Sequence, residues 1–260
     1  MMSTPIIPAV ILDALQRAHP SWQTHLRAGL QAMAEADPAY LPALAAGHYL
    51  PTEQRLFAAF TQPFQAVKYV LVGEGPYPRA ESATGVCFMD GAVGELWCGV
   101  GLAKPVNKAT SLRNFMKMLL VADGLLDPAD TGADALAPLA ARVDDEGLIA
   151  TLSELQDNLH HHGFLLLNAS LVFRPEVAPA IDARAWQPFL RSILGALAEL
   201  KPAPTLILWG KIAEQLQRLP ETSRLNQLLS EHPYNLSFIQ HGPMQQLFGP
   251  MRLLRARSRP

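Results

Sequence analysis

The spacing of apolar residues changes along the chain. Residues 11–18 and 22–36 carry apolar side chains at helical spacing, and prolines end both stretches. Beyond the first quarter of the chain the apolar residues instead form short continuous runs, which are typical of strands buried on both faces. These runs lie at 67–72, 164–167 and 205–209. A further apolar segment at 225–229 could be a fourth strand or a helix end, and the pattern alone leaves both open.

Amphipathic stretches separate these apolar runs. Residues 111–122, 186–200 and 212–219 each show an apolar stripe at helical spacing, and Ser111 is a candidate N-cap for the first of them. Strands that alternate with helices form a parallel sheet covered on both faces. The stretch 124–147 is rich in Asp, Ala, Pro and Gly. Because strands continue on both sides of it, we interpret it as a surface excursion within one domain.

Composition places the chain among globular proteins, with 49% hydrophobic and 17% charged residues. No apolar run reaches the roughly 18 residues that a membrane span needs, and the N-terminus lacks the features of a secretory signal. Cys87 and Cys98 are the only cysteines, too few for a disulfide framework. These features favour a reduced, cytoplasmic protein without membrane contact. The net charge of −2 argues mildly against strong nonspecific binding to nucleic acid, but it allows a local basic face.

Parallel sheets bind ligands outside the carboxyl ends of their strands, so the segments that follow each apolar run form the candidate site. These segments are 73–78, Asn168, 210–211 and 232–237. The first, GEGPYP, is a tight loop whose N–H groups could bind an anion or a carbonyl, although an ordinary turn explains it better on its own. Glu74 could act as a base, Asn168 could pair with the edge of an amide-like ring, and His232 could donate to developing negative charge. Each also has a commoner role, as a solvated carboxylate, a turn residue and a solvated or structural imidazole.

Several common catalytic and cofactor motifs are absent from the sequence. It contains no GxSxG elbow, HExxH helix, EF-hand loop, P-loop or GxGxxG fingerprint. The histidine tract at 160–162 resembles a metal site, but no further ligand lies at suitable spacing. We therefore expect no metal ion and no other cofactor. Spacing alone indicates an α/β protein whose site is built from loops.

Six motifs occur in order between His48 and Leu254: GEGPYP, TGVCF, TSLRN, GFLLLNASLVF, LILWGK and HPYNLS. They resemble GQDPYH, HGLCFS, PSLEN, GVLLLNAVLTV, LLWGS and HPSPLS of the family-1 uracil-DNA glycosylases. Each motif is weak by itself, whereas six in order over most of the chain make it similar to a divergent member of that family. The resemblance implies a single domain over residues 1–260, an α/β/α sandwich with a central, mostly parallel four-stranded sheet. The pattern adds a helical N-terminal part at about 9–62 and a short basic tail at 252–260.

The resemblance also implies how a base would be recognised. A deoxyuridine would be flipped out of DNA into a pocket, the route by which glycosylases reach a stacked base. At the matching positions, Phe88 would stack on uracil, and Tyr77 would crowd C5 and exclude thymine. Asn168 would read the uracil edge, with Glu74 in the same uracil-binding set. His232 would stabilise the negative charge on O2 as the glycosidic bond breaks.

Contacts to the DNA backbone follow from the same resemblance. Ser111 and Ser237 match serines that grip phosphates, and Leu236 matches the leucine that fills the space left by the flipped nucleotide. Lys211 replaces a phosphate-binding serine and keeps a phosphate contact possible through its charge. Tyr234 and the asparagine after it replace Ser-Pro in the loop that inserts into DNA. We therefore expect DNA binding by Ser111, Lys211, Tyr234, Leu236 and Ser237.

The chain departs from the family pattern at several positions of the expected site. Gly75 stands where the family has the aspartate that activates water, and glycine has no group for this task. Glu74 is the neighbouring carboxylate that could hold the water instead. Pro78 replaces a histidine near the DNA backbone, and Ala180 with Ile181 replaces Ser-His. The expected catalytic set is therefore His232 and Glu74 around the position of the missing aspartate.

Two functional hypotheses follow, with DNA as the expected partner of a monomeric protein. In the first, the protein recognises uracil in single- or double-stranded DNA and hydrolyses its N-glycosidic bond in base excision repair, at a rate reduced by the loss of the aspartate. In the second, it is an inactive homologue that binds DNA, including abasic DNA, or a protein partner. A third hypothesis, preference for another modified base, is disfavoured because Tyr77 would guard C5.

Overall fold

The computed structural model describes residues 7–257, and these residues divide into two compact units. Unit 1 combines the described chain up to Gly91 with Gly163–Leu208 and Ile212–Gln227. Unit 2 combines Ala92–His162, Trp209–Lys211 and the described chain from Leu228 onward. Each unit therefore draws on separated segments, and no single linker divides them. The single domain expected over residues 1–260 stays a prediction.

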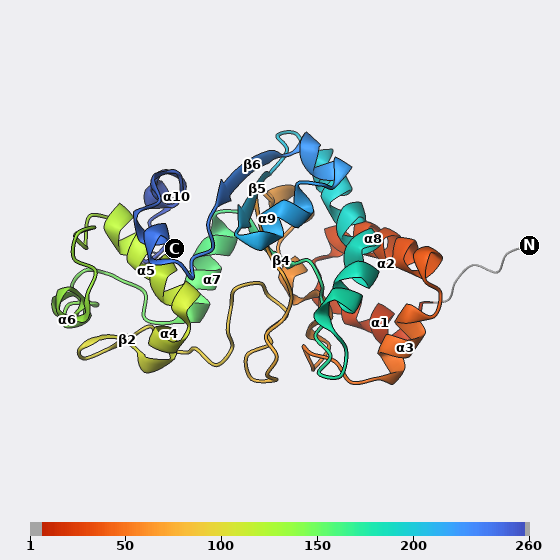
Figure 1. Ribbon diagram of the computed structural model, residues 1–260, viewed down its shortest axis with the longest axis horizontal. Coiled ribbons are helices and arrows are strands. Elements are labelled where there is room, and N and C mark those ends of the chain that lie inside the picture. Colours follow the sequence, from red (N-terminus) through yellow and green to blue (C-terminus); the bar gives the residue numbers. More distant parts are fainter. Residues whose placement is uncertain (1–6, 258–260) are drawn as a thin grey trace, which may run out of the picture. The chain divides into compact units, whose positions relative to one another are not determined.

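A four-stranded sheet in the order β4-β1-β5-β6 is the centre of the fold (Figure 1). Its strands are β1 (Tyr69–Gly73), β4 (Phe164–Asn168), β5 (Thr205–Trp209) and β6 (Asn226–Ser230). β1 pairs in parallel with both β4 and β5. The three strands predicted from apolar runs are present, with ends within two residues of the prediction, and the undecided segment is a strand. Helices flank the sheet, so the predicted α/β fold class is confirmed.

Unit 1 packs its helices around one hydrophobic core. The helices are α1 (Ala9–Ala14), α2 (Gln23–Ala36), α3 (Tyr40–Ala46), α8 (Pro179–Ala198) and α9 (Lys211–Leu216), with 3-10 helices at Leu15–Arg17, Pro20–Trp22, Arg55–Phe60, Phe64–Ala66 and Pro220–Arg224. α2 packs along α8 (Figure 1). Gly29 allows this approach, because a Cβ atom there would lie 2.6 Å from the ring of Phe189.

The longest helix of unit 1, α8, begins earlier than the apolar stripe predicts. Its first residue is Pro179, whereas the predicted stretch starts at Trp186. Proline at the first helical position and the acidic Asp182 in the first turn both favour a helix start at this point. The apolar stripe did not reveal this start because the first two turns carry mostly small or polar residues, and Ile181, their large apolar residue, is exposed.

Unit 2 consists mainly of helices and a short hairpin. Its elements are β2 (Trp97–Cys98), β3 (Gly101–Leu102), α4 (Lys104–Lys108), α5 (Thr110–Ala122), α6 (Ala133–Ala140), α7 (Leu152–His161) and α10 (Gly242–Phe248), with 3-10 helices at Leu236–Gln240 and Gly249–Met251. The expectation that Ser111 is an N-cap is wrong, since α5 begins at Thr110 and Ala109 is its N-cap. Ala109 is also the C-cap of α4, so this single residue joins the two helices. The excursion at 124–147 contains a helix, α6, with two buried leucines.

None of the helices described within residues 7–257 combines the length and the apolar character needed to cross a membrane.

Candidate functional site

The carboxyl ends of β1 and β4 form the first part of the candidate site. The two strands end in register, with Gly73 opposite Asn168. A Cβ atom at Gly73 would lie 2.6 Å from Sγ of Cys87 and 3.1 Å from Oδ1 of Asn168, so glycine allows both side chains to pack here. Ser170 N donates to the carbonyl of Glu74 at 3.1 Å and joins the two segments that follow the strands. Asn168 is therefore buried beside the GEGPYP loop.

The two aromatic residues expected to face uracil, Tyr77 and Phe88, both lie in unit 1. Phe88 has a φ of 69°, in the left-handed region that bulky residues rarely adopt. Such strain costs on the order of 1–3 kcal/mol and is concentrated at ligand sites. The residue before it is held to the central sheet, because Cys87 N donates to Leu166 O at 3.0 Å. Burial and the nearby carboxylate of Asp90 raise the pKa of the Tyr77 phenol, so this ring is neutral at physiological pH.

Gly75 borders a cavity of about 400 Å³ in unit 1. A Cβ atom at this glycine would meet its nearest neighbour, the carbonyl oxygen of Ser170, at 3.7 Å, which is an ordinary contact. Its φ is not positive either, so neither packing nor backbone conformation requires glycine here. The position has room for an aspartate. Pro78 and Ala180, two further departures from the family pattern, line the same cavity.

Among the described residues, the carboxylates that line this cavity are those of Glu74 and Asp182. Asp182 is 2% exposed and is surrounded by donors. Its Oδ1 accepts a hydrogen bond from Tyr40 Oη at 2.6 Å and one from Arg174 Nη2 at 2.6 Å. Arg174 Nε donates to both carboxylate oxygens at 3.1 and 3.2 Å. Glu74 is the exposed carboxylate of the cavity and hence the one that can reach a water molecule.

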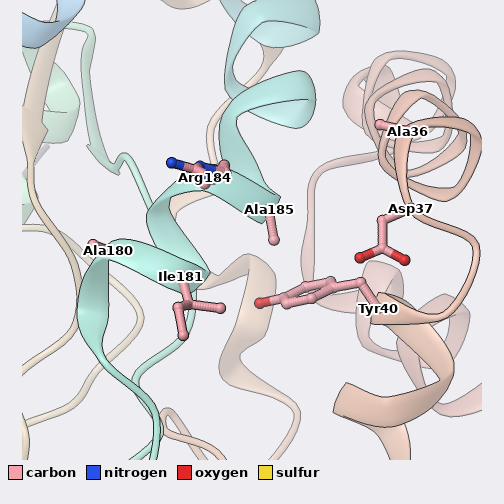
Figure 2. A pocket seen from close by; sticks show the side chains of 7 residues that line it. All are labelled: Ala36, Asp37, Tyr40, Ala180, Ile181, Arg184 and Ala185. Atoms are coloured by element: carbon pink, nitrogen blue, oxygen red, sulfur yellow. The ribbon is translucent and has the colours of Figure 1, made fainter.

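Tyr40 reaches this network from α3 and also lines a second cavity of about 480 Å³. Figure 2 shows its phenol pointing toward the start of α8, where Ala180 and Ile181 lie. Burial and the hydrogen bond to Asp182 raise the pKa of the Tyr40 phenol. The guanidinium of Arg174 lies 5.4 Å from the centre of its ring, within the range of a cation–π interaction. The sequence did not suggest this network. Tyr40 lies far along the chain from Arg174 and Asp182, and no motif includes the three residues.

His232 lies in unit 2, in the loop after β6. Its Nδ1 accepts a hydrogen bond from Tyr234 N at 3.1 Å. In the neutral ring the proton therefore sits on Nε2, which becomes a donor as the predicted role requires. Gly210, with a φ of 65°, allows the chain to pass close by, because a Cβ atom there would lie 2.9 Å from Cβ of His232. The exposed Lys211 follows directly.

The backbone of the loop 232–237 is held by a buried side chain of α5. Asn114 Nδ2 lies 2.7 Å from Pro233 O, 3.2 Å from Tyr234 O and 3.4 Å from Asn235 O. Asn114 itself is fully buried. The side chains of Tyr234 and Leu236, in contrast, are each 67% exposed. The loop thus has an anchored backbone and apolar side chains that face solvent.

Two serines were expected to grip phosphates, and their surroundings differ. Ser111 lies half-buried in the first turn of α5. Ser237 is exposed, and its hydroxyl donates to a carboxylate oxygen of Glu231 at 2.7 Å. A phosphate accepts hydrogen bonds, so it would have to replace this carboxylate to bind the Ser237 hydroxyl. The sequence did not reveal this competition.

The predicted site residues are thus divided between the units. Unit 1 holds Glu74, Gly75, Tyr77, Phe88 and Asn168. Unit 2 holds Ser111, Lys211, His232, Tyr234, Leu236 and Ser237. Within unit 1 the structure brings Asn168, Cys87 and the GEGPYP loop together, and within unit 2 it brings His232 together with the loop that carries Tyr234. In the part of the chain from residue 7 to 257, no group of three or more His, Cys, Asp or Glu side chains could hold a metal ion.

Solved structures provide close matches to this chain. The crystal structure of UNG from Nitratifractor salsuginis is 41% identical, with a TM-score of 0.87 over 94% of this chain and 96% of that chain. A single-residue variant of that protein gives 40% identity and a TM-score of 0.88, over 95% of this chain and 99% of the other. The mimivirus uracil-DNA glycosylase is 17% identical with a TM-score of 0.53, over 87% of this chain and 73% of that chain, and it shares the fold. No protein-family model matches the sequence.

Proposed function

Because the chain belongs to the UNG family of uracil-DNA glycosylases, we propose that it recognises uracil in DNA and hydrolyses the N-glycosidic bond in base excision repair. The main support for this proposal is the arrangement at the carboxyl ends of β1 and β4. There Gly73 packs against Cys87 and the buried amide of Asn168, and the strained Phe88 follows directly. A buried amide close to Cys87, with an aromatic residue held in a rare backbone conformation next in the chain, suits a site for a planar base with hydrogen-bonding edges.

Each retained residue has a defined task in this proposal. The amide of Asn168 donates to and accepts from the uracil edge, while Phe88 stacks on the ring and the neutral Tyr77 limits the space at C5. As the bond between C1′ and N1 breaks, its electron pair passes to the uracil ring. The Nε2–H of His232 donates to the oxygen that becomes negative. Water supplies the hydroxyl group that C1′ gains, and its remaining proton neutralises the uracil anion.

The rate of hydrolysis should be reduced, because Gly75 offers no carboxylate to the attacking water. Stabilisation of the leaving uracil anion and binding energy lower much of the barrier without this group. Glu74 is the accessible carboxylate of the cavity and takes over part of the task, whereas Asp182 is occupied by its donors.

The variant Gly75→Asp tests this proposal. The position has room for the side chain, so we expect single-turnover release of uracil from single-stranded DNA to rise about 100-fold, the lower end of the range for a positioned general base. Gly75→Asn is the matched control, since it has the same shape without the charge and should give a smaller increase or none. Abasic product is measured by strand cleavage in alkali.

The outcomes separate the hypotheses. Uracil release by the wild-type chain, faster in Gly75→Asp than in Gly75→Asn, supports a slow glycosylase. Bound uracil DNA without abasic product from any of the three proteins contradicts hydrolysis and favours an inactive binding module. Faster release of a C5-substituted base than of uracil would contradict the role of Tyr77.

A further inference from the structure

Exposed apolar side chains are concentrated in one short segment of unit 2. Among the described residues, six large apolar side chains are exposed, and three of them fall within positions 229–236. Tyr234 and Leu236 are the most exposed of these three, at 67% each. Exposed apolar groups on a soluble protein mark a binding surface when they cluster. We therefore expect this segment to bind a partner that has an apolar face.

The loop is rigid enough to present these side chains in one arrangement. Asn114 Nδ2 contacts three successive carbonyls of the loop, and His232 Nδ1 accepts from Tyr234 N. Asn235 N donates back to His232 O at 3.0 Å. A side chain on such a fixed backbone loses little entropy on binding. The tyrosine ring adds a flat face with only two rotatable bonds.

The loop has two cations nearby, Arg113 and Lys211, and one carboxylate, Glu231, which accepts a hydrogen bond from Ser237. Arg113 Nε lies 3.4 Å from Oδ1 of Asn114, the residue that holds the loop. Lys211 is exposed, and the glycine before it packs against His232. A flat apolar face combined with an anionic backbone is the chemistry of DNA, in which every base offers a face for stacking.

We propose that Tyr234 is a second wedge residue, which stacks on a base of the DNA that has lost its pairing partner while Leu236 fills the stack beside it. This inference rests on the proposed function and names the DNA feature that the loop recognises. Stacking of the phenol on the unpaired base would stabilise the complex with flipped or abasic DNA over the complex with intact duplex.

Binding of the full-length protein to a duplex with a stable abasic analogue tests the inference. We expect Tyr234→Ala to weaken this binding about 5- to 150-fold in fluorescence anisotropy, the range that base–aromatic stacking supplies. Tyr234→Phe keeps the ring and should bind as the wild type does. Val100→Ala, which changes another exposed apolar residue of unit 2, should also leave binding unchanged. Circular dichroism confirms that each variant is folded.

A second measurement follows the unpaired base of the DNA itself. A 2-aminopurine opposite the abasic analogue should lose fluorescence when the protein binds, because stacking quenches it, and Tyr234→Ala should abolish the loss. Equal affinities of wild type and Tyr234→Ala, or a Tyr234→Phe variant as weak as Tyr234→Ala, would overturn the inference and leave the proposed function intact. A wild-type chain that binds neither uracil nor abasic DNA would overturn both.

Discussion

Glu74 and Asp182 are carboxylates at one cavity, but their surroundings give them different chemistry. Asp182 is buried, and its oxygens already accept hydrogen bonds from Tyr40 and Arg174. Removing one partner from such a buried pair typically costs about 3–5 kcal/mol, which marks the network as structural. Glu74 is exposed and keeps its oxygens available to water. At the scale of single residues, the hydrogen-bond partners therefore decide which acid can take part in a reaction.

Glu231 provides a second example, because its charge lies beside a predicted phosphate contact. Its carboxylate accepts from the Ser237 hydroxyl at 2.7 Å, so it competes with a phosphate for this donor and repels it. We expect Glu231→Gln to strengthen DNA binding about two- to fivefold, since exposed charge pairs contribute at most about 1 kcal/mol. Anisotropy titrations at several salt concentrations measure the change, which should shrink at high salt.

The matched control for this prediction is Glu35→Gln, which removes one negative charge from an exposed position of α2. If both variants gain affinity equally, net charge is the cause and the contact between Glu231 and Ser237 has no specific role.

At the scale of elements, the packing of α2 on α8 depends on Gly29, which has no side chain. The ring of Phe189 occupies the place where Gly29 would carry its Cβ atom. This ring is buried among other aromatic residues, since Trp186 lies 5.2 Å and Phe60 lies 6.3 Å from its centre. The ring therefore has little freedom to move aside.

Two glycine substitutions in this helix pair should have opposite effects on stability. We expect Gly29→Ala to lower the free energy of unfolding by about 1–3 kcal/mol through overpacking. Gly195→Ala in α8 meets only Glu221 at 3.7 Å and should raise it by about 0.5–1 kcal/mol through helix propensity. Urea unfolding followed by circular dichroism measures both. Equal effects of the two substitutions would show that the ring of Phe189 can move aside to make room for the added methyl group.

At the scale of the whole molecule, two histidines make stability depend on pH. Burial lowers the pKa of His25, which stacks on Phe64 at 4.1 Å. Burial also lowers the pKa of His160, whose Nε2 is buried without a hydrogen-bond partner among the described residues. The folded protein therefore binds fewer protons than the unfolded chain in the range just below the ordinary pKa of about 6.5.

Stability from these histidines is complete above pH 6.5 and is lost as the pH falls through their lowered pKa values in the folded protein. We expect the urea midpoint to decrease from pH 7.5 to pH 5, as the free energy of unfolding falls by less than about 1.4 kcal/mol per pH unit for each histidine. The variant His160→Leu should show a smaller decrease than the wild type over the same range. A midpoint with the same pH dependence in both proteins would rule out this contribution of His160.

Local patterns in the sequence predicted the strands of the central sheet. Apolar runs gave the strands at β1, β4 and β5, because a strand buried on both faces needs an apolar residue at every position. The rule that ligands bind at the carboxyl ends of parallel strands pointed to Asn168 and the GEGPYP loop, which the structure brings together. The predicted start of α8 and the predicted N-cap of α5 were wrong, since α8 begins with mostly small or polar residues and α5 begins after Ala109, which has no capping side chain.

The sequence by itself therefore determined the fold class, the resemblance to uracil-DNA glycosylases and the residue at position 75, because these depend on residue type and on short-range order. Only the tertiary structure decided which groups are available for chemistry. Tyr40 and Asp182 lie 142 positions apart, and Asn114 lies 119 positions from Pro233, so nothing local indicates that they meet. Contacts at such separations depend on which surfaces pack together. They leave Glu74 open to water, saturate Asp182 with donors, and hold the loop that exposes Tyr234.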